Sequence, residues 1–233
     1  MTSLATRLEN AVVALCPDIW QRIAVNLNKR QTEKQLFEHL TLCLLSSQVS
    51  YTLAWHTNNM LSQNGLLSSI SNNDKINHYE NRLRKALSTP LTIKGKLTRY
   101  RFPNVRAHQI AKMRSAISTD RLSLHDIVYK EKDPVLIREG LIAQFTGIGL
   151  KQSSMFLRNV GRSYDLAIID SHAMDFMRAT KLASPGRNSL SARDYLNYED
   201  KLIRYANRLG YPIGCVDWAI WIVMKTAKQE NYL

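Results

Sequence analysis

The residues best suited to chemistry are a lysine that follows a glycine turn and an aspartate further along the chain. Gly147 and Gly149 are separated by one residue, and Lys151 follows them where we expect a helix to begin. Glycines permit a tight turn with positive φ, and the amides bared at a helix start can hold a phosphate. Asp170 lies in the later segment Ile168–His172. A lysine and a carboxylate beside a phosphate suit chemistry on a nucleotide.

Each of these residues also has an ordinary structural explanation. A Gly-x-Gly turn fits any tight connection between two helices. Most lysines are surface residues that keep a protein in solution. Asp170 precedes a helix expected from His172 to Leu182, so its carboxylate can serve as the N-cap. One carboxylate can cap a helix and take part in catalysis, so the two explanations of Asp170 are compatible.

The elements that must position these residues are expected to be helices, because apolar side chains recur at helical spacing and glycine and proline are scarce. The fold class predicted is therefore all-α. Asp133 and Pro134 form a helix start, with the aspartate as N-cap and the proline at the first helical position. Pro17 is expected to mark either a break in the first helical region or the start of the next helix. The predicted helical regions are Met1–Lys29, Gln31–Met60, Val105–Ile117, Val135–Gln144, Lys151 to Gly161, His172–Leu182, Ser191–Leu209 and Ile213–Lys228.

The charge of the chain points to a polyanionic partner. Its 233 residues carry a formal net charge of +13, which suits nucleic acid or an acidic membrane surface, or serves solubility alone. No acidic residue occurs from Asn81 to Thr119, and Tyr100 and Phe102 flank Arg101 there. We interpret this stretch as the main phosphate-contacting surface, the alternative being a basic helix that balances acids elsewhere. Its basic residues are Arg82, Arg84, Lys85, Lys94, Lys96, Arg99, Arg101, Arg106, Lys112 and Arg114.

The sequence also indicates a location and excludes some kinds of site. The first residues carry charges through their apolar positions and do not form a signal peptide. No apolar run is long enough to span a membrane. Cys16, Cys43 and Cys215 are far apart and odd in number, which fits buried thiols in a reducing cytoplasm better than a disulfide framework. Four clustered thiolates are absent, so neither an iron–sulfur cluster nor a zinc site is expected.

A longer string of residues resembles a known family. It consists of Gly147-Ile148-Gly149-Leu150-Lys151, then Phe156-Leu157-Arg158-Asn159, then Asp170-Ser171-His172. This string is similar to the helix-hairpin-helix motif and following aspartate of the DNA glycosylase superfamily. Within that superfamily, the chain most resembles the archaeal-type 8-oxoguanine DNA glycosylase/lyase family, from Leu36 to Trp221 and most strongly from Phe145 to His172.

The resemblance implies an architecture and partners. One helical lobe would run from about residue 35 to 161 and include the hairpin. Residues 1–34 and 162–233 would form the second lobe, with a DNA-binding cleft between the two. The expected partner is double-stranded DNA that contains a modified base, bound by a monomer without a membrane. No cofactor is expected, although the resemblance implies that hairpin carbonyls can hold a monovalent cation.

The resemblance also assigns roles to the two candidate catalytic residues. Lys151 would attack C1′ of the nucleotide, displace the base and leave a Schiff base, after which β-elimination can cut the strand. An ε-amine attacks only when it is neutral, and the partial positive charge of a helix start favours that form. Asp170 would stabilise the positive charge on the sugar and assist proton movement between the amine and the departing base.

Further residues would bind the DNA and the extruded base. Gln48 follows Ser46 and Ser47 and is either part of an ordinary polar step or the residue that fills the gap left by the base. Trp218 and Trp221 are expected on one face of the last helix, with Trp221 the better candidate for stacking on the base. The complete set of predicted DNA-binding residues is Gln48, Arg101, Gly147, Gly149 and His172.

Of two departures from the family pattern, the one in the last residues leaves the substrate open. Ser171 stands where arginine is usual, and the chain ends in Glu230–Leu233 where the family usually ends in lysine. The default substrate by resemblance is 8-oxoguanine. One alternative is a glycosylase for another base, either alkylated or a hypermodified pyrimidine of phage DNA in antiviral defence. The other is a non-catalytic helix-hairpin-helix module that binds DNA, although such a module needs neither Lys151 nor Asp170.

Overall fold

The protein folds as two compact helical units, seen in a computed structural model that describes residues 3–27, 29–68, 76–118, 122–184 and 190–229. One unit combines Met1–Lys29 with Leu157–Leu233 and is called the terminal unit below. The other, Arg30–Phe156, is called the central unit. Helix α8 (Leu150–Asn159) begins in the central unit and ends in the terminal unit.

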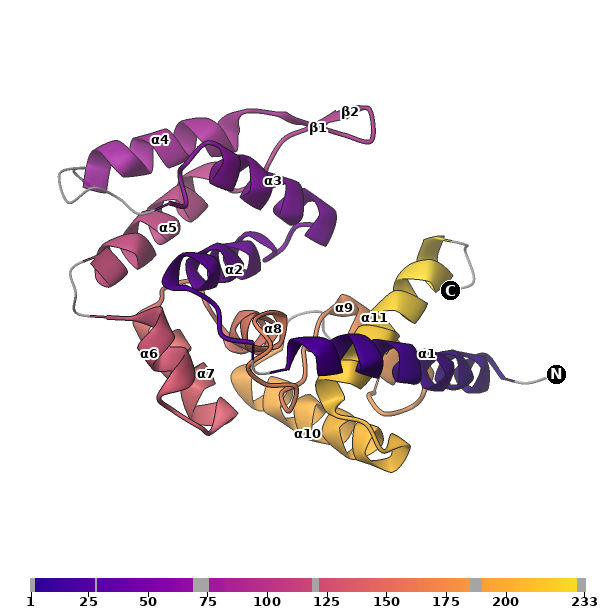
Figure 1. Cartoon of the computed structure of the whole chain (residues 1–233). Helices are drawn as coiled ribbons and strands as arrows, with labels where there is room; N and C mark the ends of the chain where they lie inside the picture. Colours follow the sequence, from indigo (N-terminus) through magenta and orange to yellow (C-terminus); the bar gives the residue numbers. More distant parts are fainter. Residues whose placement is uncertain (1–2, 28, 69–75, 119–121, 185–189, 230–233) are drawn as a thin grey trace. The chain divides into compact units, whose positions relative to one another are not determined.

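The terminal unit is built around its last helix. Helix α11 (Ile213–Gln229) packs against α1 (Leu4–Asn26) and α9 (Ser171–Ala179), and α10 (Ala192–Leu209) also contacts it (Figure 1). The apolar face of α1 contributes side chains that are almost wholly buried, among them Val12, Cys16 and Ile23. Burial of such side chains is the main stabilising contribution to a helical core.

Neither the break nor the helix start expected at Pro17 occurs, because α1 continues through this residue. Proline has no N–H, so the carbonyl four residues earlier loses its intrahelical partner. That carbonyl belongs to Val13, which is 44% exposed. Water can therefore satisfy it, and the apolar face of the helix remains intact on both sides of the proline.

The central unit contains most of the remaining helices and one small sheet. Helices α4 (Ile76–Ser88) and α5 (Pro103–Ser118) lie side by side along their length (Figure 1). The other elements of this unit are α2 (Glu33–Leu45), α3 (Tyr51–Gln63), β1 (Leu91–Ile93), β2 (Lys96–Thr98), α6 (Leu124–Tyr129), α7 (Pro134–Gln144) and the start of α8.

The small sheet is a feature that the all-α prediction missed. Strands β1 and β2 pair antiparallel, with Ile93 opposite Lys96. Between them Lys94 and Gly95 have φ values of 49° and 74°, the backbone that a two-residue hairpin turn requires. The alternation in Leu91–Thr98 is short, so the helical periodicity on either side obscured it. Apart from this hairpin, the predicted fold class is confirmed.

The region predicted as one helix from Gln31 to Met60 consists of two helices. Helix α2 begins with a capping box, in which Thr32 and Gln35 each bond the other's backbone amide. It ends at Leu45, and Ser50 caps the start of α3 through the amide of Leu53. The polar residues between these helices therefore form a turn in place of a solvent-facing helical step.

The predicted start of α7 and the predicted buried thiols are confirmed. Helix α7 begins with Pro134 at its first position and ends at Gln144, and Asp133 Oδ1 accepts the amide of Val135 at 2.8 Å. The three cysteines are free and buried. In the described ranges, no group of His, Cys, Asp and Glu side chains is suited to hold a metal ion. None of the helices in those ranges is long and apolar enough to cross a membrane.

Candidate active site

A hairpin of two helices presents the candidate lysine. Helix α7 ends at Gln144, and Phe145, which is 1% exposed, anchors the turn in the core. The amide of Ile148 bonds the carbonyl of Phe145 at 3.1 Å and closes the turn. Gly147 has a φ of 93°, in the region that side chains other than hydrogen disfavour. The predicted helix-hairpin-helix, with a glycine turn between its two helices, is present.

Lys151 lies in the first turn of α8, directly after this turn. The backbone bond from the Ser153 amide to the Gly149 carbonyl, 3.0 Å long, belongs to that first turn, and Ser153 Oγ donates to the same carbonyl at 2.7 Å. The amides of Leu150, Lys151 and Gln152 therefore precede the regular helical ladder and face the start of the helix, where a phosphate can bind. Lys151 is half-buried, and in the described part of the central unit no acidic side chain pairs with it.

The hairpin turn rests on helix α5. A Cβ atom added to Gly147 would lie 2.4 Å from Gln109 Nε2, so the amide of Gln109 occupies the space where a side chain would be. Gln109 Oε1 accepts a hydrogen bond of 2.6 Å from Arg106, and Arg106 also donates to the Ser47 carbonyl at 3.5 Å. Two side chains of α5 thus connect the hairpin to the turn that contains Gln48.

Gln48 lies at the exposed tip of that turn. Its φ is 62°, which is unusual for a residue with a side chain. Two hydrogen bonds hold the residues before this turn in place. Tyr100 Oη donates to the Leu45 carbonyl at 2.8 Å, and Ser46 Oγ donates to the Cys43 carbonyl at 2.8 Å. A side chain presented from a fixed, exposed turn is suited to contact a large partner.

The basic stretch divides into exposed and buried residues. Arg101 is exposed beside Phe102, with its guanidinium carbon 5.1 Å from the ring centroid. In contrast, Arg106 and Arg114 are 8% and 7% exposed. Arg114 donates to the carbonyls of Leu67 and Ser68 and therefore stabilises the core. The prediction that the whole stretch contacts phosphates is wrong for these two arginines, because both are buried and their guanidinium groups donate to acceptors inside the fold.

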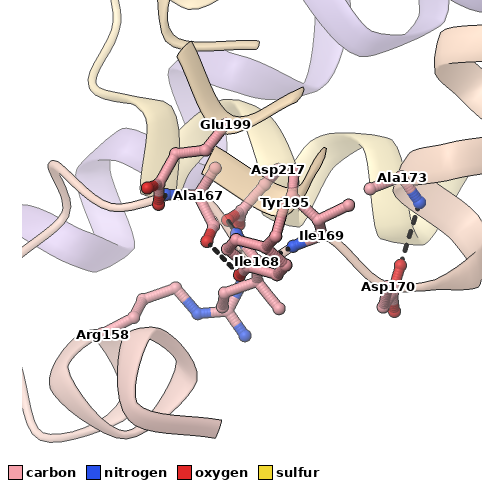
Figure 2. A network of polar contacts seen from close by, with 9 residues as sticks. All are labelled: Arg158, Ala167, Ile168, Ile169, Asp170, Ala173, Tyr195, Glu199 and Asp217. Atoms are coloured by element: carbon pink, nitrogen blue, oxygen red, sulfur yellow. Dashed lines mark hydrogen bonds and ion pairs between the residues drawn. The ribbon is translucent and has the colours of Figure 1, made fainter. Parts of the chain in front are cut away.

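Asp170 belongs to the terminal unit and is the N-cap of α9. Its Oδ1 accepts the Ala173 amide at 2.9 Å (Figure 2). Its own amide donates to the Ile168 carbonyl at 3.0 Å. The capping role predicted from the sequence is therefore confirmed. The cap uses one carboxylate oxygen, and the residue is half-buried.

His172 and Trp221 lie together in the terminal unit. Their ring centroids are 6.2 Å apart and the rings meet edge to face. Burial lowers the pKa of His172, opposed by the nearby Asp170 carboxylate, so the imidazole is neutral at pH 7 and has one N–H to donate. Lys225 Nζ lies 4.4 Å from the Trp221 ring centroid and covers one face of the indole.

Trp218 has a different environment. The guanidinium carbon of Arg158 lies 5.8 Å from its ring centroid, and Arg158 pairs with the buried Asp217. This contact gives Trp218 a packing role. Residues 230–233 lie outside the described residues. The family resemblance had linked this end of the chain to the choice of base.

The predicted site residues fall into both units. Gln48, Arg101, Gly147, Gly149 and Lys151 belong to the central unit, and Asp170, His172, Trp218 and Trp221 belong to the terminal unit. Sequence reasoning assigned no function to Gln109, Arg158, Tyr195, Glu199 and Asp217, and assigned Arg106 to phosphate contact; all six hold the segments around the predicted site residues. For these residues, the one signal that the sequence offered was Asp217, the single acidic residue in the otherwise apolar first part of α11.

Comparison with known proteins places the chain in a family. The family model described as 8-oxoguanine DNA glycosylase matches residues 21–211. The chain belongs to this family. Two relatives named 8-oxoguanine DNA glycosylase/AP lyase are similar to it. That of Saccharolobus solfataricus is 34% identical over 196 residues, or 84% of each chain. That of Sulfolobus acidocaldarius is 32% identical over 205 residues, or 88% of this chain and 87% of the relative.

Solved structures of the 8-oxoguanine DNA glycosylase family have the same fold. The enzyme of Thermotoga maritima superposes with a TM-score of 0.70 at 26% identity, covering 94% of each chain. The Methanocaldococcus jannaschii glycosylase/lyase in complex with a 15mer DNA containing 8-oxoguanine gives 0.69 at 24% identity, covering 88% of each chain. The helix-hairpin-helix glycosylase fold expected from the resemblance is thereby confirmed.

Proposed function

We propose that this chain excises 8-oxoguanine from double-stranded DNA and then cleaves the strand, with Lys151 as the nucleophile. The observation that carries the proposal is the place of Lys151 in the first turn of α8, directly after the Gly147 turn, in a member of the 8-oxoguanine DNA glycosylase family. The relatives' shared name, 8-oxoguanine DNA glycosylase/AP lyase, supports both steps.

The reaction begins with the neutral amine of Lys151. Its lone pair forms a bond to C1′, the bond from C1′ to the base breaks, and the base takes the electron pair and a proton. Asp170 stabilises the positive charge that develops on the sugar and moves the proton from the amine to the base. Opening of the sugar ring gives a Schiff base. Loss of a proton from C2′ then expels the 3′ phosphate and cuts the strand.

Residues of each unit bind the DNA. Arg101 contacts the phosphate backbone from its exposed position, and the amides at the start of α8 bind a further phosphate. Gln48 fills the gap that the flipped base leaves. In the terminal unit, His172 donates to the target backbone, and Trp221 stacks on the extruded base.

The other candidate functions receive less support. A glycosylase for an alkylated base, or for a hypermodified pyrimidine in antiviral defence, would keep Lys151 and Asp170 and differ in its pocket. The names of the relatives favour 8-oxoguanine over these substrates. A non-catalytic DNA-binding module would require neither residue.

Borohydride trapping on a duplex that contains 8-oxoguanine tests the proposal. We expect the wild type to form a covalent adduct, and Lys151→Gln to lose it together with excision, by on the order of 10³-fold or more. Lys34→Gln, an exposed lysine of α2 in the same unit, is the matched control and should react as the wild type does. An adduct that persists in Lys151→Gln contradicts the assignment of the nucleophile. Excision only from other modified duplexes contradicts the substrate.

A further inference from the structure

The segment that leads into Asp170 is held by side chains at three consecutive amides. The Ala167 amide donates to Glu199 Oε1 at 3.1 Å, the Ile168 amide to Asp217 Oδ2 at 2.9 Å, and the Ile169 amide to Tyr195 Oη at 3.2 Å (Figure 2). Tyr195 Oη in turn donates to the Ala167 carbonyl at 2.9 Å. These three acceptors come from helices α10 and α11.

Such a segment needs polar partners because it is buried and has no regular secondary structure. Ala167, Ile168 and Ile169 are at most 6% exposed, so each amide must find an acceptor within the protein. Backbone carbonyls or neutral side chains would suffice for stability alone. Two of the three acceptors are carboxylates, whose hydrogen bonds are shorter and stronger and therefore define the backbone position more closely.

Asp217 also joins this segment to the helix that carries Lys151. Its Oδ1 pairs with Arg158 Nη1 at 2.7 Å, and Arg158 lies in the last turn of α8. One buried carboxylate, 4% exposed, thus contacts both the end of the hairpin helix and the amide two residues before Asp170. Burial of a carboxylate is costly, and apolar replacements of buried ion pairs often stabilise proteins, so stability alone is a weak reason for this arrangement.

We propose that Asp217 is a positioning residue for Asp170. Through the Ile168 amide, Asp217 holds the Ala167–Ile169 segment in place, and it ties this segment to Arg158 of α8. Glu199 and Tyr195 complete the same clamp on either side. The inference rests on the proposed function, because it needs Asp170 to act on the substrate. The Asp170 amide donates to the Ile168 carbonyl at 3.0 Å, so a shift of Ile168 moves Asp170 directly.

Asp217→Asn tests this role, since the amide oxygen can still accept from Ile168 while the charge that orients Arg158 is lost. We expect single-turnover excision of 8-oxoguanine to slow by about 10- to 100-fold, because small misplacements of a catalytic group have effects of that size. Affinity for a duplex with an uncleavable tetrahydrofuran abasic site should stay within about twofold. Val216→Ala, at the fully buried neighbouring position of α11, is the control for lost stability and should excise at the wild-type rate.

A double-mutant cycle separates positioning from general destabilisation. If Asp217 acts through Asp170, adding Asp217→Asn to Asp170→Asn should slow the remaining excision, followed over hours, by less than about twofold. A full additional loss in that background overturns the proposal, as does wild-type excision by Asp217→Asn alone. If Asp217→Asn does not fold, Tyr195→Phe takes its place in the double-mutant cycle with Asp170→Asn. This variant removes the partner of the Ile169 amide, and the same two outcomes support or overturn the positioning role.

The outcomes for the proposed function and for this inference are distinguishable. A wild type that neither excises 8-oxoguanine nor is trapped through Lys151 overturns both. A wild type that excises normally, beside an Asp217→Asn variant that is equally fast, overturns the positioning role alone. Slow excision by Asp217→Asn with unchanged affinity for the abasic duplex supports the role.

Discussion

Gly147 lies against the side-chain amide of Gln109, which occupies the space that a Cβ atom on residue 147 would need. Because Gln109 is also bonded to Arg106, and Arg106 to the Ser47 carbonyl, the contact joins the hairpin turn to the turn of Gln48. Two proposed DNA-contacting segments of the central unit are therefore held by one pair of side chains on α5.

Gly147→Ala should destabilise the protein and weaken DNA binding. The positive φ by itself costs about 1–2 kcal/mol for a residue with a Cβ, and the new methyl group must displace Gln109 from Arg106. Chemical denaturation measures the first effect and affinity for an abasic duplex the second. Gly210→Ala is the control, because its φ is 74° and nothing lies within 4 Å of the added atom. An equal loss of stability in both variants would show that the contact with Gln109 is unimportant.

Asp170→Asn should separate capping from catalysis. Asparagine caps helices as well as aspartate does, so we expect the free energy of unfolding to change by less than about 0.5 kcal/mol. Excision should nevertheless fall by about 10²- to 10⁴-fold, since the amide cannot move a proton or stabilise positive charge in the same way. Asp170→Ala should lose a further ~1 kcal/mol of stability through the missing cap. Normal excision by Asp170→Asn would assign Asp170 a structural role only.

The stability of the terminal unit should depend on the ionisation of Asp217. Burial raises the pKa of Asp217 to about 7, and the Arg158 guanidinium and the Ile168 amide partly oppose this shift. A pKa raised in the folded state means that the folded protein holds a proton that the unfolded chain has released. The free energy of unfolding should therefore fall as the pH rises from about 4 to about 7, by on the order of 1–4 kcal/mol.

Denaturation of the wild type and of Asp217→Asn across this pH range checks the sign. Asparagine does not titrate, so the difference between the two proteins isolates residue 217 from groups such as His172, whose pKa is lowered by burial. The stability advantage of the wild type over the variant should be largest near pH 4 and decline toward pH 7. A constant difference would mean that Asp217 titrates at its ordinary value.

Arg101→Gln should weaken DNA binding in a salt-dependent way. Loss of one phosphate contact should reduce the slope of log affinity against log salt by about 0.9, without altering the melting temperature, because Arg101 is exposed. Arg114→Met should do the opposite, lowering stability and leaving the salt slope unchanged, because Arg114 is buried against Phe37 and two backbone carbonyls. Binding titrations at several salt concentrations distinguish the two results.

What the sequence determined by itself was local. The Asp133–Pro134 helix start, the Gly147 turn and the capping position of Asp170 each depend on neighbours a few residues away, and all three are present. The hairpin and the lysine after it could be recognised for the same reason. The short β1–β2 hairpin was missed because three residues a strand give too little alternation to stand out from helical periodicity.

Tertiary structure alone decided how these local features are held. Packing decides whether an arginine contacts phosphate or the core. It buries Arg114 and leaves Arg101 exposed. The bond between Asp217 and Ile168 joins residues 49 positions apart, and no periodicity relates them. A buried amide takes whichever acceptor the packed helices bring to it, so such partners are defined only when the chain has folded.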